Sequence, residues 1–306
     1  TGSDGLPRPG AVDTTLMSHA TGGGYFYVNG FATLTVPTGV TTIVASHGFE
    51  YVPARRTITV KRATTVYVTL ERLVDLSGEG WFAGDAHTHA RHGPINYYLT
   101  PTQVWRVARA EGLSVLESLD DDWQFTGEPS PVSDARTILC FSYEHRNQIG
   151  GHLGLPGLQG AVSGGCCLSP QPPHPMLVDL AAEAHQQTGA RVVLSHPHTT
   201  DDYDMLSDWP GAGLGRELPV LAALGGLDAV DVASYSNDPD LDTQDWFALL
   251  SAGSSLPPSA GTDAALSWYY SAPPGGWRVY ARQSTLPLDH DRWLDALAAG
   301  RCFVTS

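Results

Sequence analysis

The stretch Gly84-Asp85-Ala86-His87-Thr88-His89 places two histidines, separated by one residue, at the end of a predicted β-strand. Because the side chains of a strand alternate between its two faces, the rings of His87 and His89 point the same way. Imidazole is a common ligand of zinc and related divalent ions. Paired histidines also occur on surfaces and in ordinary cores, so this pair alone is only weak evidence for a metal site.

Three later segments also place a metal-binding side chain just after a predicted strand. They are Tyr143-Glu144 with Gly151-His152, Leu194-Ser195-His196-Pro197-His198, and Ala260-Gly261-Thr262-Asp263. Carboxylate and imidazole are the usual ligands of zinc and related ions. The four segments in this order therefore predict a metal site, although no single one of them would.

From Trp81 onward, predicted strands alternate with predicted helices. One helix opens at Thr100-Pro101 and ends near Gly112, a second covers 177–187, and Asp289 caps a third. The predicted strands of this region lie at 113–116, 138–142, 191–194, 227–232 and 302–304. Such alternation predicts a parallel sheet, open or closed into a barrel. We expect a barrel, because all four ligand segments fall at strand ends and must converge on one point.

The first ~75 residues have a different pattern of short, alternating, β-branched segments. Predicted strands lie at 24–28, 32–36, 42–46, 56–60 and 65–70, with turn residues such as Asn29-Gly30 between them. Several short strands in so small a region predict an antiparallel sandwich. We therefore expect a β-sandwich of immunoglobulin or transthyretin type over residues 1–78, followed by an α/β domain over 79–306.

The charge balance restricts the class of partner. The chain of 306 residues has 17 basic and 32 acidic side chains and a formal charge of −15. This balance argues against nucleic acid or an anionic membrane and suits a protein that attracts cations. Because no run of ~18 apolar residues is present, we expect a soluble protein without a membrane span. The start Thr1-Gly2-Ser3 is neither a signal peptide nor a usual initiator, so an exported or periplasmic location stays open.

The four cysteines give little information about disulfides or function. Cys166 and Cys167 are adjacent in a glycine- and serine-rich stretch, whereas Cys140 and Cys302 lie in predicted strands. The lack of a Cys-x-x-Cys pair argues against a structural zinc ribbon. The sequence leaves the disulfide status of all four, and the oligomeric state, undecided.

Taken together, these motifs resemble the PHP (polymerase and histidinol phosphatase) metallohydrolases, and most of all their CehA/McbA branch, named for carbaryl-hydrolysing enzymes. The matching segments are 80–89, Glu144 with 151–153, 195–197, 215–219, 260–263 and 300–305. The resemblance covers nearly the whole chain and implies a distorted (β/α)7 barrel preceded by a small β-domain. Relatives commonly continue beyond the position of Ser306, so a longer parent protein stays open.

The resemblance also implies a set of metal ligands. One divalent ion would be held by His87, His89, Glu144 and Asp263. A second would be held by Glu144, His152 and His196, so that Glu144 bridges the two. We expect one or two ions, with zinc as the first choice and manganese or iron as alternatives. Two ions ~3.5–4 Å apart can share and acidify a water molecule and polarise a substrate oxygen.

The sequence departs from the family at the ligands of a third ion, which PHP proteins typically hold. The second predicted strand of the barrel ends in Leu119-Asp120-Asp121-Asp122 without a histidine, and Ala265 occupies the position two residues after Asp263. His92 lies too close to His89 to match the remaining ligand. We therefore expect at most two ions and little phosphomonoesterase activity, because a phosphomonoester dianion needs more cationic compensation than two partly neutralised ions provide.

The sequence thus predicts a metal-dependent hydrolase that cleaves an ester, carbamate or amide bond in a small-molecule substrate. A PHP-type phosphoesterase and a non-catalytic protein with a degraded metal site stay open as alternatives. Asp120 and His198 are the candidate catalytic residues, although each has a simpler explanation as a solvated turn or loop residue. His174, His185 and His290 lie in or beside predicted helices without metal-binding spacing, and we expect no role for them.

Overall fold

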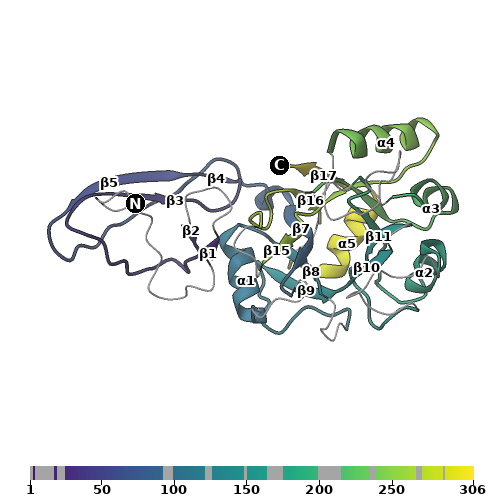
Figure 1. Cartoon of the computed structure of the whole chain (residues 1–306), viewed down its shortest axis with the longest axis horizontal. Helices are drawn as coiled ribbons and strands as arrows, with labels where there is room; N and C mark the ends of the chain where they lie inside the picture. The colour runs from purple at the N-terminus through teal and green to yellow at the C-terminus, as the bar shows by residue number, and fades with distance from the viewer. Residues whose placement is uncertain are drawn as a thin grey trace.

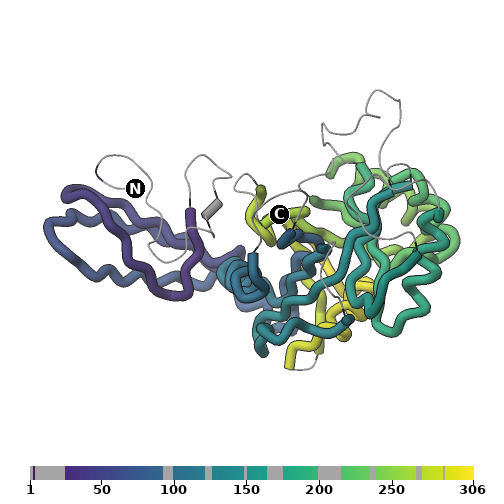
Figure 2. The backbone as a smooth tube through the Cα atoms, turned by 60° about the horizontal axis from the view of Figure 1, so that its bottom comes forward, coloured from purple at the N-terminus to yellow at the C-terminus, as the bar shows by residue number. Residues whose placement is uncertain are grey.

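The structure, a computed structural model, describes residues 3, 17–18, 25–91, 99–120, 126–147, 150–163, 175–198, 215–234, 239–266, 271–284 and 287–306. The protein is mixed α/β, with antiparallel strands at its N-terminus (Figure 1). These strands extend away from the α/β part on one side, as the second view also shows (Figure 2). None of the described helices is both long and apolar enough to cross a membrane.

The N-terminal strands form three antiparallel pairs. These are β1 (Met17–Ser18) with β2 (Tyr25–Phe26), β3 (Gly39–Ala45) with β5 (Ala54–Val60), and β4 (Tyr51–Val52) with β6 (Glu71–Arg72). The predicted strands at 32–36 and 65–70 are wrong, because burial alternates there but no strand forms. Alternation describes an extended backbone, whereas a strand also needs a hydrogen-bonded neighbour. A packed sandwich over residues 1–78 stays a prediction.

The α/β part begins with a six-stranded sheet. Its strands are β17 (Cys302–Thr305), β16 (Arg278–Arg282), β7 (Trp81–His89), β8 (Val115–Leu119) and β9 (Ile138–Ser142), in that order, with β15 (Ala264–Ala265) beside β7. Strands β15, β7, β8 and β9 run parallel, as the strand–helix alternation predicts. Strand β16 departs from that prediction, because it is antiparallel to both β7 and β17.

A second sheet has five strands. They are β10 (Glu144–Asn147), β11 (Gly151–Gly154), β12 (Val193–Ser195), β13 (Ala229–Ala233) and β14 (Pro258–Ala260). The first three are antiparallel and the last three are parallel. The described hydrogen-bonded ladders thus form a mixed second sheet, and closure of the two sheets into a barrel stays a prediction.

The helices are α1 (Pro101–Ala110), α2 (Leu177–Ala184), α3 (Leu218–Leu224), α4 (Pro239–Ser251) and α5 (His290–Ala298), with a short 3-10 turn, η2 (Ser77–Glu79). Helix α1 starts as predicted, with a reciprocal capping box between Thr100 and Gln103. Asp289 caps α5 by accepting a hydrogen bond from the backbone N–H of Arg292 at 3.0 Å. Helix α4 is unpredicted, because its aromatic and aliphatic residues cluster over 246–250 instead of recurring every three or four positions.

Helix α5 packs against strands of both sheets and fixes their positions. Its Trp293 is fully buried, and the indole Nε1 donates a hydrogen bond to the carbonyl oxygen of Phe82 at 2.9 Å. A Cβ atom at Gly84 would lie 2.2 Å from Cζ2 of Trp293, so only glycine lets β7 approach the helix this closely. The same core includes Val193 of β12 and Ala229 of β13. Helix α5 therefore packs against β7 and β12, the strands that lead to His87, His89 and His196.

Candidate metal centre

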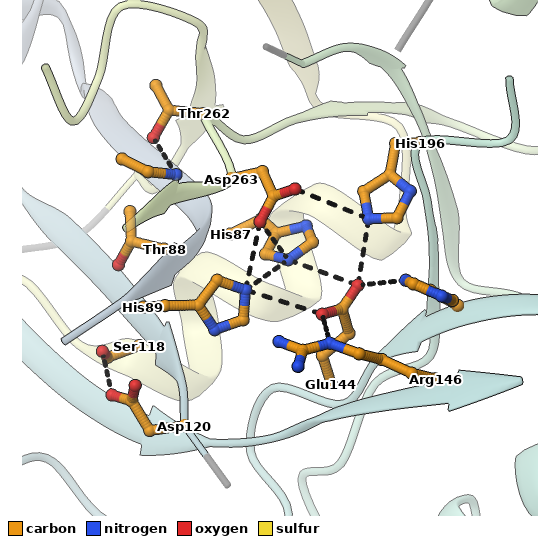
Figure 3. Close-up of polar contacts among 12 residues, drawn as sticks. His87, Thr88, His89, Ser118, Asp120, Glu144, Arg146, His196, Thr262 and Asp263 are labelled. Carbon is orange, nitrogen blue, oxygen red and sulfur yellow. Dashed lines mark hydrogen bonds and ion pairs between the residues drawn. The ribbon is translucent and has the colours of Figure 1, made fainter. Parts of the chain in front are cut away.

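The structure brings the six predicted ligands together at the ends of strands from both sheets (Figure 3). His87 and His89 end β7, Glu144 opens β10 and His152 lies on β11. His196 directly follows β12, and Asp263 lies between β14 and β15. Residues up to 176 positions apart in the sequence therefore face one another, which ordinary surface histidines would not do.

Four of these side chains surround one point. The Nε2 atoms of His87 and His89 lie 3.1 Å apart, and each lies 3.5 Å from an oxygen of Glu144. They also lie 3.4 Å and 3.1 Å, respectively, from Oδ1 of Asp263. Ligand atoms that are ~2.0–2.2 Å from one tetrahedral ion lie roughly 3.3–3.6 Å from one another. The spacing of this group therefore fits a single divalent ion.

The second group shares Glu144. Nδ1 of His152 lies 2.9 Å from Oε1 of Glu144, and Nε2 of His196 lies 3.0 Å from the same oxygen. His196 also reaches Asp263, with Nε2 3.8 Å from Oδ2. Ring nitrogens of four histidines thus lie within 3.5 Å of one carboxylate. This is the arrangement expected of a carboxylate that bridges two ions.

Burial and charge make the site a tightly coupled network. The side chains of His87, His89 and Glu144 are at most 2% exposed, whereas those of His152 and Asp263 are 16% and 14% exposed and mark its open edge. Burial alone would raise the pKa of Glu144, but Arg146, His87 and His152 hold it well below its usual value. Burial alone would lower the pKa of His87, but Glu144 and Asp263 hold it well above its usual value. A bound ion would replace the protons of this network.

Backbone conformation also sets this site apart. Among the described non-glycine residues, only His196 and Asp263 have positive φ, of 27° and 51°. Such conformations cost of order 1–3 kcal/mol and cluster at functional sites. A Cβ atom at Gly261 would lie 2.4 Å from Cβ of His87, so glycine is required where the chain passes beside this histidine. The backbone N–H of Asp263 then donates to the carbonyl oxygen of His87 at 2.8 Å.

A buried carboxylate, Asp85, joins these two segments. It accepts hydrogen bonds from the backbone N–H groups of Thr262 at 2.9 Å, Gly275 at 2.7 Å and His87 at 3.2 Å. Burial raises the pKa of Asp85 to about 6, although these hydrogen bonds oppose the shift. Asp85 therefore holds His87 and the Asp263 segment in register.

Two further charged residues border the site and were not predicted. Oδ2 of Asp231 on β13 lies 3.8 Å from Nδ1 of His87, and neither carboxylate oxygen has a hydrogen-bond partner among the described residues. Metal-ligating histidines usually present their second ring nitrogen to such a carboxylate. Nε of Arg146 donates to Oε2 of Glu144 at 2.7 Å. Two features of the sequence could have indicated these residues. Asp231 is an acidic residue inside the apolar run 227–232, and Arg146 lies two residues after Glu144 and therefore on the same strand face.

The two predicted catalytic residues lie outside these ligand groups. Asp120 is fully buried and accepts hydrogen bonds from the backbone N–H groups of Ala90 at 3.1 Å and Arg91 at 2.6 Å, which links the ends of β8 and β7. Its alternative interpretation as a solvated turn residue is therefore wrong. Nε2 of His198 lies 2.7 Å from Oδ2 of Asp245 on α4. A catalytic role for either residue stays a prediction.

The other residues singled out in the sequence have different outcomes. Ala265 pairs in register with His89 on β7 and offers no ligand atom. His92, Asp121, Asp122, Cys166, Cys167 and His174 lie outside the described residues. Cys140 and Cys302 have free thiols. His185 pairs with Asp228 at the surface at 2.9 Å, whereas His290 is buried against Glu117, which the sequence did not predict.

No protein-family model matches the sequence, and the search of curated proteins also gives no match. Solved structures do match. PsfC from Pseudomonas syringae PB-5123 is 15% identical with a TM-score of 0.51, over 74% of this chain and 91% of PsfC. A two-domain protein from Bacteroides vulgatus ATCC 8482, described as containing a predicted PHP-like metal-dependent phosphoesterase, is 15% identical with a TM-score of 0.48, over 74% of this chain and 66% of that one.

Endonuclease Q, in complex with a 27-mer duplex that has an abasic lesion at the active site, is 12% identical with a TM-score of 0.42, over 69% of this chain and 55% of that one. At such identities, the similarity to PsfC shows a shared fold and no more. The function must therefore be argued from the site. The chain shares its fold with PsfC and holds buried histidine, glutamate and aspartate clusters that are suited to divalent metal ions.

Proposed function

We propose that this protein is a PHP-type metal-dependent hydrolase whose centre holds one or two divalent ions. The observation that carries the proposal is the position of Glu144, with ring nitrogens of four histidines from three separate regions of the chain within 3.5 Å. A purely structural metal site rarely needs a carboxylate shared between two ligand groups. A hydrolytic site with two ions commonly has one, because a shared carboxylate would hold the ions close enough to act on the same water molecule.

The proposal includes the finer features that the sequence implies. We assign the ligands of one ion as His87, His89, Glu144 and Asp263, and those of the other as Glu144, His152 and His196. We regard the two sheets as the walls of a distorted PHP-type barrel and place the chain in the CehA/McbA-like branch. Zinc is the preferred ion, because imidazole and carboxylate dominate the ligand set.

The chain's own residues have distinct roles in this proposal. A bound ion would supply Lewis acidity and a water molecule of lowered pKa. Glu144 and Asp263 would balance the ionic charge, and Arg146 holds the Glu144 carboxylate in position from the side. Asp231 lies behind His87 and would fix its ring orientation. The partly exposed edge at His152 and Asp263 would admit the substrate.

We propose a neutral ester, carbamate or amide as the bond that is cleaved. The acidic side chains of Glu144 and Asp263 are already part of the site, and each would add negative charge beside a bound substrate. Ala265 offers no third-ion ligand where a histidine is typical of the family. A phosphomonoester dianion would meet this negative charge, whereas a neutral carbonyl group would not.

The test is metal analysis of the purified protein, followed by turnover of p-nitrophenyl acetate, an aryl carbamate, an anilide and p-nitrophenyl phosphate, with and without chelator. We expect metal-dependent turnover of at least one neutral substrate, sharply reduced by Asp263→Asn. His185→Ala is the control, because this histidine pairs with Asp228 at the surface. Faster turnover of the phosphate than of the acetate would favour the phosphoesterase alternative. Metal binding without any turnover would favour the non-catalytic one.

A further inference from the structure

A second cluster of metal-binding side chains lies in the core beneath helix α5. Glu117 on β8 and Cys140 on β9 are direct neighbours in the strand register and therefore share one face of the sheet. His290, the first residue of α5, covers that face. The carboxylate, thiol and imidazole thus come from three elements and meet at one place.

The contacts within the cluster are close. Nε2 of His290 lies 2.5 Å from Oε1 of Glu117, and one ligand atom from each of the three residues lies within 4.8 Å of the others. Glu117 is 0% exposed, and Cys140 and His290 are each 3% exposed. None of the three belongs to the ligand groups around Glu144.

The cluster leaves buried polar atoms unsatisfied. Neither Oε2 of Glu117 nor Nδ1 of His290 has a hydrogen-bond partner among the described residues, and Nδ1 lies 3.7 Å from Oδ1 of Asp291. A buried carboxylate oxygen without a partner costs about 1–3 kcal/mol and needs an explanation, of which a bound ion is one. A salt bridge between Glu117 and His290 satisfies only one of the two oxygens.

We propose that Glu117, Cys140 and His290 form a second metal site, which binds a single zinc-like divalent ion independently of the Glu144 centre. Thiolate, imidazole and carboxylate together are zinc ligands. Three protein ligands leave one of four tetrahedral positions for a small ligand such as water. This site does not rest on the proposed hydrolase activity.

Charge balance favours a divalent ion in this apolar core. Burial raises the pKa of the Cys140 thiol to about 11, so the thiol is protonated when no ion is bound. Burial alone would lower the pKa of His290, but the Glu117 carboxylate holds it well above its usual value. With His290 paired as an imidazolium against Glu117 and the thiol protonated, the metal-free cluster would have no net charge.

Binding of the ion would release one proton from Sγ of Cys140 and one from Nε2 of His290 to solvent. The two charges of the ion then balance the thiolate and the carboxylate, with a neutral imidazole. The cluster keeps zero net charge in both states, which avoids the large cost of burying an unbalanced charge. A monovalent ion bound to the thiolate and the carboxylate would leave the cluster negative.

The ion would also support the Glu144 centre mechanically. It would join the N-terminus of α5 to the middle of β8 and β9. The hydroxyl of Thr88, between His87 and His89, donates to the carbonyl oxygen of Glu117 at 2.8 Å. An ion bound to Glu117 would thus hold β8 in place, and β8 is the neighbour of the strand that carries His87 and His89.

Cobalt substitution tests the proposal, because a thiolate bound to Co²⁺ gives a near-ultraviolet charge-transfer band that nitrogen and oxygen ligands do not. The Glu144 centre contains no cysteine, so we expect the band in the cobalt-loaded wild-type protein and its loss in Cys140→Ser. Glu117→Gln, which keeps side-chain size, should weaken cobalt retention by at least about tenfold. If Cys140→Ser does not fold, the cobalt retention of Glu117→Gln provides the test instead.

Three control variants separate this site from the other cysteines and from the Glu144 centre. Cys302→Ser should keep the band, because its Sγ lies 3.5 Å from the carbonyl oxygen of Pro258 and outside the cluster. Cys166→Ser/Cys167→Ser should also keep it. His196→Ala/Asp263→Asn, which removes ligands from the Glu144 centre, should retain the band and one ion per chain. The absence of a band in wild type, or its survival in Cys140→Ser, would overturn the proposal and leave a buried ion pair.

Discussion

Substitution of Gly261 by alanine tests how closely the chain must pass beside the metal centre. The new Cβ would lie 2.4 Å from Cβ, 2.6 Å from the backbone nitrogen and 2.9 Å from Cα of His87. Non-bonded carbon atoms approach to about 3.5–4.0 Å, so the overlap at Cβ exceeds about 1 Å. The obstacle is largely backbone, which no side-chain rotation can relieve. Either the end of β14 or His87 itself must move.

This overlap has two measurable consequences. Overpacking of a well-packed core costs about 1–3 kcal/mol, so the free energy of unfolding of the metal-free protein should fall by that amount, and that of the metal-loaded protein by more if the variant holds its ions less tightly. Metal ligands tolerate displacements of only about 0.2 Å, so a shift of His87 near 1 Å should weaken ion retention. A misplacement of that size should also reduce turnover by about 100-fold. We expect the three effects together.

Gly160→Ala is the matched control. No atom lies within 4 Å of the Cβ that it would add, and the residue has no positive φ. The same substitution should therefore be neutral or stabilise the fold by about 0.4–1 kcal/mol. The assays are thermal unfolding with and without chelator, metal content and hydrolysis. If Gly261→Ala retained its ions and unfolded at the wild-type temperature, the inference of a required close approach would be refuted.

Three further predictions concern the same centre. Glu144→Gln should remove the ion held with His152 and weaken the other, because its carboxylate contacts both ligand groups; a variant with undiminished metal content would contradict this. Asp231→Asn should weaken ion retention by about 10–100-fold in a chelator competition, without lowering the melting temperature of the metal-free protein, and wild-type retention would exclude the orienting role. The raised pKa of His87 means that its ion pairs stabilise the metal-free protein fully below pH 6.5 and are lost as the pH rises through the folded-state value. The melting temperature of the metal-free protein should therefore fall as the pH rises through that range. That of the metal-loaded protein should change less, because bound ions need neutral imidazoles. A melting temperature of the metal-free protein that rises with pH would contradict the assignment.

The four candidate segments could be found from sequence because they combine metal-binding side chains with the ends of predicted strands, whereas the assignment of individual ligands came from the family resemblance. His196 and Asp263 illustrate this, since each lies just after a predicted strand. Asp231 could not be assigned, because its role depends on how β13 lies against His87 and not on a local pattern. The Glu117–Cys140–His290 cluster was missed for the same reason, as its members are 23 and 150 positions apart.

The fold was predictable where local signals agree. Thr100, Pro101 and Gln103 specify the start of α1 without help from tertiary contacts. The segment 65–70 has strand-like alternation, yet strand formation depends on a neighbouring chain that alternation does not specify. Strand β16 is antiparallel to β7 for a similar reason, since strand direction follows from the path of the connecting chain.

Anomalous diffraction from crystals of the metal-loaded protein, recorded on both sides of the metal absorption edge, tests the central claim most directly. We predict one or two peaks beside Glu144, each ~2.0–2.2 Å from ring nitrogens of its assigned histidines. One peak should lie among His87, His89 and Asp263, and a second, if present, between His152 and His196. A peak near Cys140 would bear only on the second site. No peak beside Glu144, or a third ion in the same centre near Ala265, would contradict the account.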